Sequence, residues 1–307
     1  MQAILGASGQ IGRELARCLH ASHTSDIRLV SRRPLQVNPG DQWRQADLLD
    51  PGQAQRAVEG SAIVYLTAGL PMDTRLWVEQ WPAMMANVIA ACSAHGAKLV
   101  FFDNTYMYPQ TAVPQTEETP FLPQGEKGQV RAEIARTLLA AIAEGRVEAM
   151  ICRAPEFYGP GITQSITNTT VIEKLRAGKK ARVFVRDDTL RTLIYTPDAS
   201  RAMARLGNTP DAYGQTWHLP SDDQRLTYAQ FIALAAEVFR IDARHQVLKP
   251  WQIRAAGLFS RQVRDATELL PRYAVDNIFV SDKFKARFPD FRVTTLRQGL
   301  EAIGAEA

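Results

Sequence analysis

Gly6-Ala7-Ser8-Gly9-Gln10-Ile11-Gly12 is the stretch of sequence that decides the fold. It follows a short apolar run, Gln2–Leu5, that predicts a strand, and it opens an amphipathic run, Ile11–His20, that predicts a helix. In such a turn the first glycine permits the tight bend, the second lets a ligand approach the backbone, and the third lets the helix pack near the strand. The N-terminus of the helix offers free N–H groups to an anion. This stretch therefore predicts a pyrophosphate site, and a glycine-rich turn without a ligand is the alternative.

Apolar and amphipathic runs alternate over about the first 155 residues. Strands are predicted at 2–5, 27–31, 62–67, 98–102 and 149–152, and helices at 11–20, 51–58, 81–95 and 131–143. Apolar strands separated by helices indicate a parallel sheet covered on both faces. Right-handed crossovers then give a doubly wound α/β Rossmann fold. We expect residues 1–154 to form this dinucleotide-binding domain.

The pattern changes after about residue 155, where the segments become longer and richer in Gly, Pro and Thr. Strands are predicted at 182–185 and 193–195, and helices at 227–239, 250–258 and 264–270. We expect residues 155–307 to form mostly a smaller substrate-binding lobe, with segments that return to the first domain.

The end of the second predicted strand bears on which dinucleotide binds. An NAD site usually places an acidic residue about twenty residues past the glycine turn, where it binds the ribose 2′-hydroxyl. Here that place holds Ser31, followed by Arg32 and Arg33. Guanidinium groups bind a 2′-phosphate that a carboxylate would repel. The sequence therefore favours NADP(H), and a pair of solvated surface arginines is the alternative.

Two further segments are candidates for the cofactor site. Asp47-Leu48 precedes the predicted helix at 51–58, where the pair would flank the adenine. Thr67-Ala68-Gly69 ends the predicted strand at 62–67, where small residues let the backbone pass beneath the ribose.

Composition narrows the function classes. The chain has 307 residues, 46% of them hydrophobic, and a net charge of +4 that is too small and scattered to indicate nucleic-acid binding. No long apolar stretch predicts a membrane span, and the first strand begins too early for a signal peptide, so we expect a cytoplasmic protein. Cys18, Cys92 and Cys152 stand alone without metal-ligand spacing, so no metal site is expected.

Several segments together resemble the short-chain dehydrogenase/reductase superfamily, in its extended and atypical, NAD-dependent epimerase/dehydratase-like branches. They are the glycine turn, Asp47-Leu48, Arg153-Ala154-Pro155-Glu156-Phe157-Tyr158-Gly159-Pro160, 191–199, Asp276 and Val280-Ser281-Asp282-Lys283. The resemblance implies that the backbone at Pro155 and Phe157 lies beside the nicotinamide. It also makes a homodimer through the helices at 81–95 and 131–143 a reasonable expectation.

Reductases of this superfamily use a Tyr and a Lys in Y-x-x-x-K spacing, and this sequence has no such pair where it should fall. Two alignments of this motif with the sequence are possible, and one of them puts Gly125 and Gln129 in the places of the Tyr and the Lys. The other puts Lys127 and Arg131 there, and we prefer it because it keeps cations facing the ribose. A solvated start of a helix is the alternative for these two residues.

The end of the predicted strand at 98–102 holds the remaining candidates for catalysis. In the resemblance, Asn104 takes the place of the catalytic serine, where its amide can polarise a carbonyl. Tyr106 and Tyr108 are the nearest tyrosines that could supply a proton, although each could serve packing alone. Asp103 could orient either residue or a water.

Three functions fit these features. The first is an NADP(H)-dependent oxidoreductase that acts on a small carbonyl, alcohol or activated alkene. In this function Tyr106 or Tyr108 would be the acid, and Asn104 would polarise the substrate oxygen. Lys127 would bind the ribose and supply positive charge. The second is a non-catalytic NADP(H)-binding redox sensor that acts through partners, as the missing Tyr–Lys pair suggests. The third is a nucleotide-sugar epimerase or dehydratase, which Arg32-Arg33 and the missing pair disfavour.

Overall fold

A computed structural model describes residues 1–161, 163 and 165–305 of the chain. The chain forms two compact units, each assembled from separate stretches. Unit 1 comprises 1–107, 126–154 and 199–219, and unit 2 comprises 108–125, 155–198 and 220–307. The chain therefore passes from one unit to the other after residues 107, 125, 154, 198 and 219.

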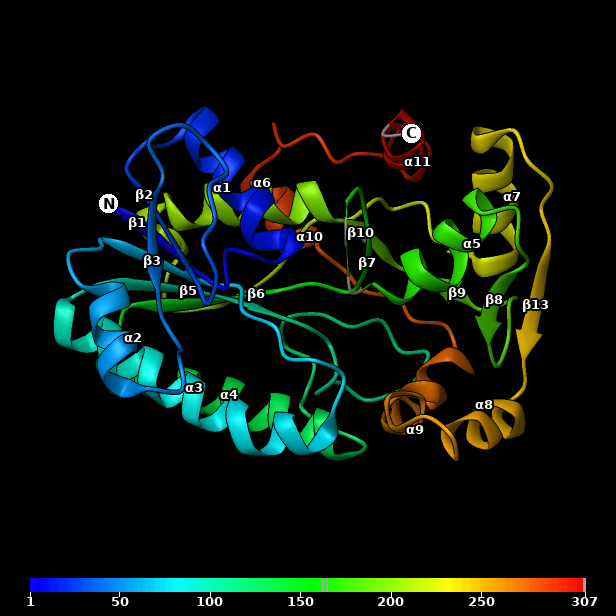
Figure 1. Ribbon diagram of the computed structural model, residues 1–307, viewed down its shortest axis with the longest axis horizontal. Coiled ribbons are helices and arrows are strands. Elements are labelled where there is room, and N and C mark those ends of the chain that lie inside the picture. The colour runs from blue at the N-terminus through cyan, green and yellow to red at the C-terminus, as the bar shows by residue number, and fades with distance from the viewer. Residues whose placement is uncertain (162, 164, 306–307) are drawn as a thin grey trace. The chain divides into compact units, whose positions relative to one another are not determined.

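Unit 1 contains a seven-stranded parallel sheet in the order β11-β6-β5-β4-β1-β2-β3 (Figure 1). The strands are β1 (Gln2–Leu5), β2 (Ile27–Ser31), β3 (Gln42–Gln45), β4 (Ile63–Leu66), β5 (Lys98–Asp103), β6 (Ala149–Arg153) and β11 (Thr216–His218). This arrangement confirms the expected doubly wound α/β fold. The strand β11 comes from the second half of the chain and pairs with β6 at one edge.

The helices of unit 1 cover both faces of the sheet (Figure 1). One face carries α2 (Pro51–Val58), α3 (Thr74–His95) and α4 (Glu126–Ala143), and the other carries α1 (Gln10–Ser22) and α6 (Thr196–Gly207). On that second face the Ser200 hydroxyl of α6 donates to the Ile11 carbonyl of α1 at 3.1 Å. A 3-10 turn at Pro210–Ala212 precedes β11.

In unit 1, α3 and α4 begin well before the residues at which the sequence predicts them. The predicted start of α3 near residue 81 is wrong, because the Asp73 carboxylate caps the helix by accepting from the Leu76 N–H at 3.2 Å, and the helix continues through Pro82. The predicted start of α4 at residue 131 is also wrong, since the helix begins at Glu126, directly after Gly125 with its φ of 80°. Both Lys127 and Arg131 therefore lie on α4, within its first two turns.

The order of the strands fixes where a ligand can bind in unit 1. The strand β1 lies between β2 and β4, so the chain first winds toward β3 and then crosses back toward β4. In such sheets the crevice at this reversal, outside the carboxyl ends of the strands, is the ligand site. The glycine turn after β1 and the ends of β2, β4 and β5 all meet at this edge.

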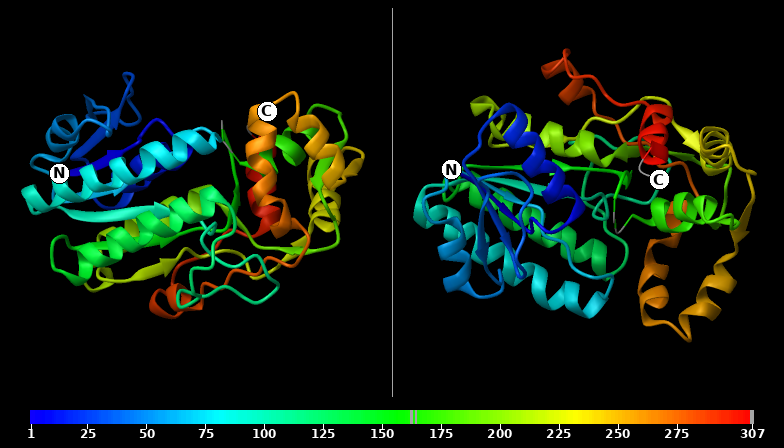
Figure 2. Two further views of the ribbon diagram at one scale, coloured as in Figure 1. Left: turned by 90° about the horizontal axis from the view of Figure 1, so that it is seen from below. Right: turned by 45° about the horizontal axis from the view of Figure 1, so that its top comes forward.

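Unit 2 is built from paired short strands and helices (Figure 2). Its strands pair as β7 (Glu156–Tyr158) with β10 (Leu193–Tyr195), β9 (Leu190–Arg191) with β12 (Leu226–Thr227), and β8 (Ala181–Phe184) with β13 (His245–Leu248). Its helices are α5 (Glu173–Arg176), α7 (Tyr228–Phe239), α8 (Pro250–Gly257), α9 (Arg261–Ala266), α10 (Asp282–Arg287) and α11 (Leu296–Ala305), with a π turn at Asn168–Ile172.

Unit 2 has its own apolar core, to which α5, α7, β8 and α11 all contribute. The expected helix at 227–239 is confirmed, and Thr227 caps it with a full capping box. The expected helix at 264–270 is wrong in its bounds: Ser260 caps α9 through the Val263 N–H, so that helix starts at 261, and a 3-10 segment, Thr267–Tyr273, follows it.

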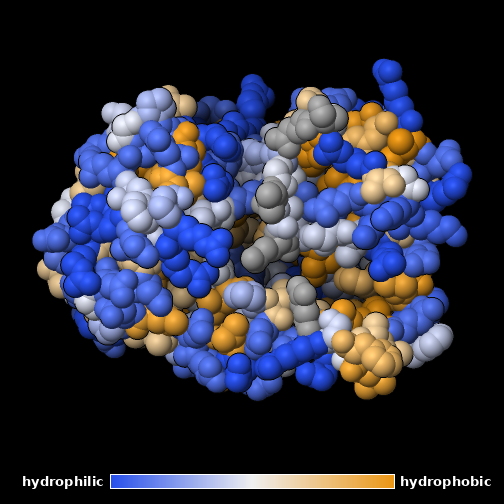
Figure 3. Space-filling model, in the orientation of Figure 1, coloured by the Kyte–Doolittle hydropathy of each residue, from blue (hydrophilic) through white to orange (hydrophobic). Residues whose placement is uncertain are grey.

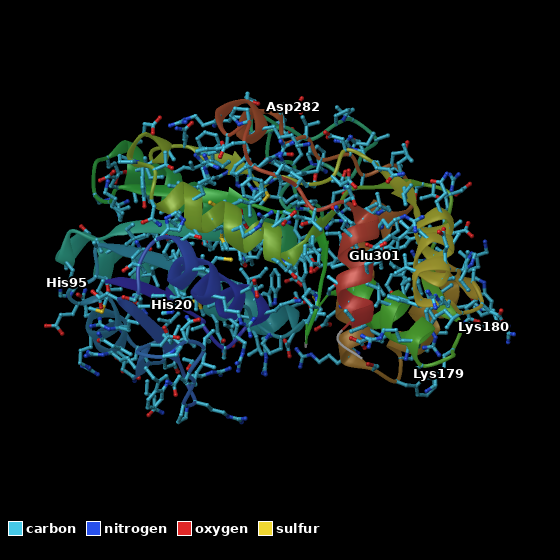
Figure 4. All side chains as sticks on the ribbon, turned by 90° about the horizontal axis from the view of Figure 1, so that it is seen from above. His20, His95, Lys179, Lys180, Asp282 and Glu301 are labelled. Carbon is cyan, nitrogen blue, oxygen red and sulfur yellow. The ribbon has the colours of Figure 1, made fainter. Side chains whose placement is uncertain are left out.

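The surface exposes both charged and apolar side chains. Figure 3 shows a mostly hydrophilic face, with apolar side chains gathered at the lower right. Trp251 on α8 and Phe259, just after this helix, are 69% and 92% exposed. Figure 4 shows His20 and His95 on separate helices and Lys179 beside Lys180 at an exposed turn. Within the described residues, no three metal-ligating side chains gather, and no helix is long and apolar enough to cross a membrane.

Candidate functional site

The glycine turn links β1 to α1 through a tightly packed backbone. Gly6 has a φ of 87°, a left-handed conformation that favours glycine, and its N–H donates to the Val30 carbonyl of β2 at 3.1 Å. A Cβ built on Gly6 would lie 2.4 Å from the Ala68 Cα. A Cβ on Gly12 would lie 2.8 Å from the Ala7 Cα. Both glycines are therefore required by packing between the turn, β4 and α1.

Gly9 differs from the other two glycines. It is the N-cap of α1, and a Cβ built there would meet only the Gly6 carbonyl, at 3.5 Å. Packing inside the protein therefore does not require a glycine at this position. The first turn of α1 contains no acidic residue, so the positive end of its helix dipole is not neutralised there. Open space beside a bare backbone at a helix N-terminus is what a bound phosphate needs.

The other residues of the turn surround Gly9. Ser8 is exposed, and its carbonyl accepts from the Arg13 Nε at 3.1 Å. Gln10 is half-buried, and Ile11 is buried under the first turn of α1. The turn thus presents its backbone and the Ser8 side chain outward.

Two exposed arginines follow β2. Ser31 is buried at the end of the strand, whereas Arg32 and Arg33 are exposed. Among the described residues, neither of these two guanidinium groups has a carboxylate partner. Their charge is therefore available to an anion at the carboxyl end of β2.

The ends of β3 and β4 lie at the same edge of the sheet. Asp47 is exposed, and its carboxylate accepts from the Leu49 N–H at 3.0 Å, while Leu48 is buried. The Thr67 hydroxyl donates to the Leu5 carbonyl at 3.1 Å, which joins β4 to β1. Ala68 lies directly beneath Gly6, and Gly69 is exposed.

A buried ionic cluster stands at the ends of β5 and β6. The Asp103 carboxylate is fully buried, and one of its oxygens accepts from Arg131, whose Nε lies 2.9 Å away. Its other oxygen accepts from Arg153 Nη2 at 3.1 Å. The Arg131 guanidinium also lies over the Trp81 ring, at 4.5 Å from the ring centre. The sequence did not show this pairing, because the three residues are distant along the chain.

Lys127 is fully buried, and its Nζ donates to the Thr74 hydroxyl of α3 at 2.5 Å. Lys127 and Arg131 lie four residues apart on α4 and so share one face of that helix. The structure therefore places the residues of the preferred alignment on the side of α4 that faces into unit 1. It does not place them at a solvated start of the helix.

The three polar candidates after β5 lie in different surroundings. Asn104 is half-buried, and its carbonyl oxygen accepts from the Tyr106 N–H at 2.9 Å, which leaves its amide to donate. Tyr106 is half-buried and stacks on Trp77, with ring centres 5.9 Å apart. Tyr108 belongs to unit 2, is 1% exposed and packs against Phe121. Asn104 and Tyr106 are thus close in space, and Tyr108 is enclosed by packing.

Pro155 and Phe157 lie at the start of the 155–198 stretch of unit 2, beside a buried ion pair that sequence reasoning missed. Glu156, between them, accepts from Arg191 Nη2 at 3.2 Å and from the Tyr228 hydroxyl at 2.7 Å. Burial raises the pKa of the Glu156 carboxyl, but Arg191 and the hydrogen bond from Tyr228 outweigh it and hold that pKa below its ordinary value. The ion pair fixes the backbone of β7.

We expect Glu156 to make the protein sensitive to acid. Because its pKa is lowered in the folded state, its contribution is present above the unfolded pKa and is lost as the pH falls through the folded value. Urea unfolding should therefore show the free energy of unfolding falling below about pH 4. Glu156→Gln should lower this free energy at pH 7 by about 3–5 kcal/mol, because Arg191 stays buried without its partner. It should also flatten the acid limb of the pH profile, and an unchanged limb would contradict this role.

Comparisons with known proteins agree with this architecture. The model of the family described as "NAD dependent epimerase/dehydratase family" matches residues 3–219. A curated relative, 2′-dehydrokanamycin reductase of Streptomyces kanamyceticus, is 26% identical over 226 residues, which are 71% of this chain and 61% of that protein. The chain thus spans less than two thirds of that relative's length.

Solved structures show the same fold at low identity. UDP-glucuronic acid 4-epimerase from Bacillus cereus, in complex with NAD, superposes with a TM-score of 0.81 at 15% identity and covers 99% of this chain and 96% of its own. UDP-glucose 4-epimerase of Thermus thermophilus, also with NAD, gives 0.78 at 16% identity and covers 100% of both chains. At such identities the likeness concerns the fold alone.

Proposed function

Because the chain belongs to the NAD dependent epimerase/dehydratase family, we propose that it is an NADP(H)-dependent oxidoreductase acting on a small carbonyl or alcohol. The observation that carries the proposal is the pairing of two features at one edge of the sheet. They are the open backbone at Gly9 and the two exposed arginines at the end of β2.

The residues at this edge fit a phosphorylated dinucleotide. The space beside Gly9 and the N-terminal end of α1 suit the pyrophosphate, and Arg32 and Arg33 suit a 2′-phosphate. Asp47 and Leu48 would flank the adenine, and Thr67-Ala68-Gly69 would lie beneath a ribose. The other half of the dinucleotide would extend past β4 toward Asn104, Lys127 and Arg131.

The chemistry divides between the cofactor and the chain. A bound nicotinamide supplies or accepts a hydride. The Asn104 amide would donate a hydrogen bond to the substrate oxygen, and Tyr106 would give or take its proton, because it is the more exposed of the two candidate tyrosines. Lys127 and Arg131 would supply positive charge, while Asp103 holds Arg131 in place.

The cofactor assignment is tested by an Arg32→Ala/Arg33→Ala variant. Because a hydrogen bond to a charged group contributes about 1.5–3 kcal/mol, we expect NADPH affinity to fall about ten- to hundredfold, with NADH affinity unchanged. Calorimetric titration measures both. A control variant, Arg75→Ala/Arg136→Ala, removes two exposed arginines from α3 and α4 and should change neither affinity. If NADPH affinity fell equally in the control variant, the effect of Arg32→Ala/Arg33→Ala would be due to net charge alone.

The catalytic assignment is tested with Tyr106→Phe, once a substrate that oxidises NADPH is found. Loss of a positioned acid should lower kcat about 10²- to 10⁴-fold and leave the KM for NADPH unchanged. Tyr108→Phe should have little effect, because that side chain is enclosed by packing. Unchanged turnover when both tyrosines are replaced would remove both from the mechanism.

The substrate class draws support from the curated relative, whose name describes it as a reductase of 2′-dehydrokanamycin. We therefore place ketones on polar, sugar-like molecules first in a substrate screen with NADPH. The solved neighbours include epimerases of UDP-sugars, but their identity of 15–16% supports no transfer of substrate.

A second candidate function is a redox sensor that binds NADP(H) without catalysis. It is favoured by the replacement of the Tyr–Lys pair with Lys127 and Arg131, which both contact other residues of unit 1. A sensor should bind NADPH and NADP⁺ with different affinities and change conformation with only one of them. Turnover of any carbonyl with NADPH would favour the enzyme instead. A homodimer through α3 and α4 would fit either function, and light scattering of the purified protein tests it.

A further inference from the structure

The backbone after β2 is held in place by side chains of β3. The Trp43 Nε1 donates to the Ser31 hydroxyl oxygen at 3.1 Å, and the Ser31 hydroxyl donates to the Arg33 carbonyl at 2.6 Å. The Gln45 Nε2 donates to the Arg32 carbonyl at 3.3 Å. Since β2 and β3 pair in parallel, with Ser31 opposite Gln45, these bonds join neighbouring strands at the carboxyl edge of the sheet. Both arginine carbonyls are therefore fixed from β3.

These bonds also determine what each group can offer a ligand. The only proton of the Ser31 hydroxyl is directed to the Arg33 carbonyl, so Ser31 has no donor left for a phosphate. Recognition of a 2′-phosphate then depends on the Arg32 and Arg33 guanidinium groups, which are exposed. A long exposed side chain loses conformational entropy when it binds, and a fixed backbone reduces the number of conformations that must be lost.

We propose that Trp43 and Ser31 form a relay that holds the Arg32–Arg33 backbone in the conformation needed to bind the 2′-phosphate. Trp43 is thus a positioning residue for cofactor specificity, acting through Ser31. The inference rests on the proposed NADP(H) function and adds to it a residue on β3 that the glycine turn and the arginine pair do not reveal. Trp43 is 38% exposed although its indole N–H is bonded, so the ring does not serve the core alone.

The relay is tested by the ratio of the dissociation constants for NADH and NADPH. NADH lacks the 2′-phosphate, so the ratio isolates recognition of that group, whereas a merely structural defect weakens both ligands alike. Trp43→Phe keeps an aromatic ring and removes the indole N–H. Ser31→Ala removes the hydroxyl, and Ser31→Thr keeps it. Because one neutral hydrogen bond is lost, the ratio should fall about three- to tenfold in Trp43→Phe and in Ser31→Ala, and Ser31→Thr should retain it.

The double variant Trp43→Phe/Ser31→Ala separates a relay from two independent contacts. If Trp43 acts through Ser31, the NADH/NADPH ratio of dissociation constants should fall no further in the double variant than in Ser31→Ala alone. The matched control is Trp217→Phe, which also loses an indole N–H bond, from Nε1 to the Ala212 carbonyl at 2.8 Å, but lies on β11 at the opposite edge of the sheet. Its ratio should equal that of the wild type.

The outcomes distinguish this inference from the function on which it rests. A wild-type protein that binds no dinucleotide, or prefers NADH, would overturn the NADP(H) function and the relay with it. A wild type that prefers NADPH, with an unchanged ratio in Trp43→Phe and Ser31→Ala, would overturn the relay alone. The relay would also be overturned if the NADH/NADPH ratio fell in the double variant by the combined effect of the two single variants.

Discussion

Asp103→Ala is expected to lower the free energy of unfolding by about 3–5 kcal/mol, because it leaves two guanidinium groups buried without their shared carboxylate. Arg131 and Arg153 have side chains that are 4% and 1% exposed, so water cannot replace the lost partner. Urea denaturation followed by circular dichroism measures the change. We expect a lower midpoint with an unchanged slope.

The control for Asp103 is an ion pair on the same two strands. Lys98, at the start of β5, bonds to Glu148, just before β6, at 2.6 Å, and these side chains are 34% and 51% exposed. Exposed pairs contribute about 0–1 kcal/mol, so Glu148→Ala should have little effect. If both variants lowered the free energy of unfolding equally, the Asp103 cluster would contribute no more to stability than an exposed ion pair does.

Gly9→Ala is expected to separate ligand binding from folding. Because a Cβ at Gly9 meets only one atom, at 3.5 Å, the variant should lose no more than about 1 kcal/mol of stability, as a change at a helix N-cap does. The same Cβ occupies the space that a pyrophosphate needs. Losing one charge-assisted hydrogen bond to a phosphate should lower the affinity for every nicotinamide dinucleotide about ten- to hundredfold.

Gly12→Ala provides the contrast. A Cβ at Gly12 would lie 2.8 Å from the Ala7 Cα and 2.9 Å from the Gly6 carbonyl oxygen, so the backbone must shift. Forcing extra volume into a packed region typically costs about 1–3 kcal/mol, which thermal unfolding would show. If Gly9→Ala bound dinucleotides as tightly as the wild type, the space beside Gly9 would not be a phosphate site.

Local signals in the sequence predicted the core of unit 1. The glycine turn and the apolar strands each act over a few residues, so their pattern can be read directly. The start of α3 was predicted near residue 81, whereas Asp73 caps the helix farther upstream and the helix continues through Pro82.

Features that depend on distant residues could not be predicted. The return of 216–218 to the sheet beside β6, the Asp103 cluster and the Glu156–Arg191 pair each join positions more than twenty residues apart. The sequence did predict that polar residues gather after β5, because the carboxyl ends of parallel strands meet at one edge. It gave no sign that Arg131 binds Asp103, since that contact depends on how α4 packs on the sheet.

The most direct test of the account is a calorimetric titration of the purified, nucleotide-stripped protein with NADPH, NADP⁺, NADH and NAD⁺. The open turn at Gly9 and the free arginines after β2 predict saturable binding, with the phosphorylated dinucleotides bound about ten- to hundredfold more tightly than NADH and NAD⁺. Binding of none of the four would contradict the central claim that this edge of the sheet holds a dinucleotide. Tighter binding of NADH and NAD⁺ would contradict the role of Arg32 and Arg33.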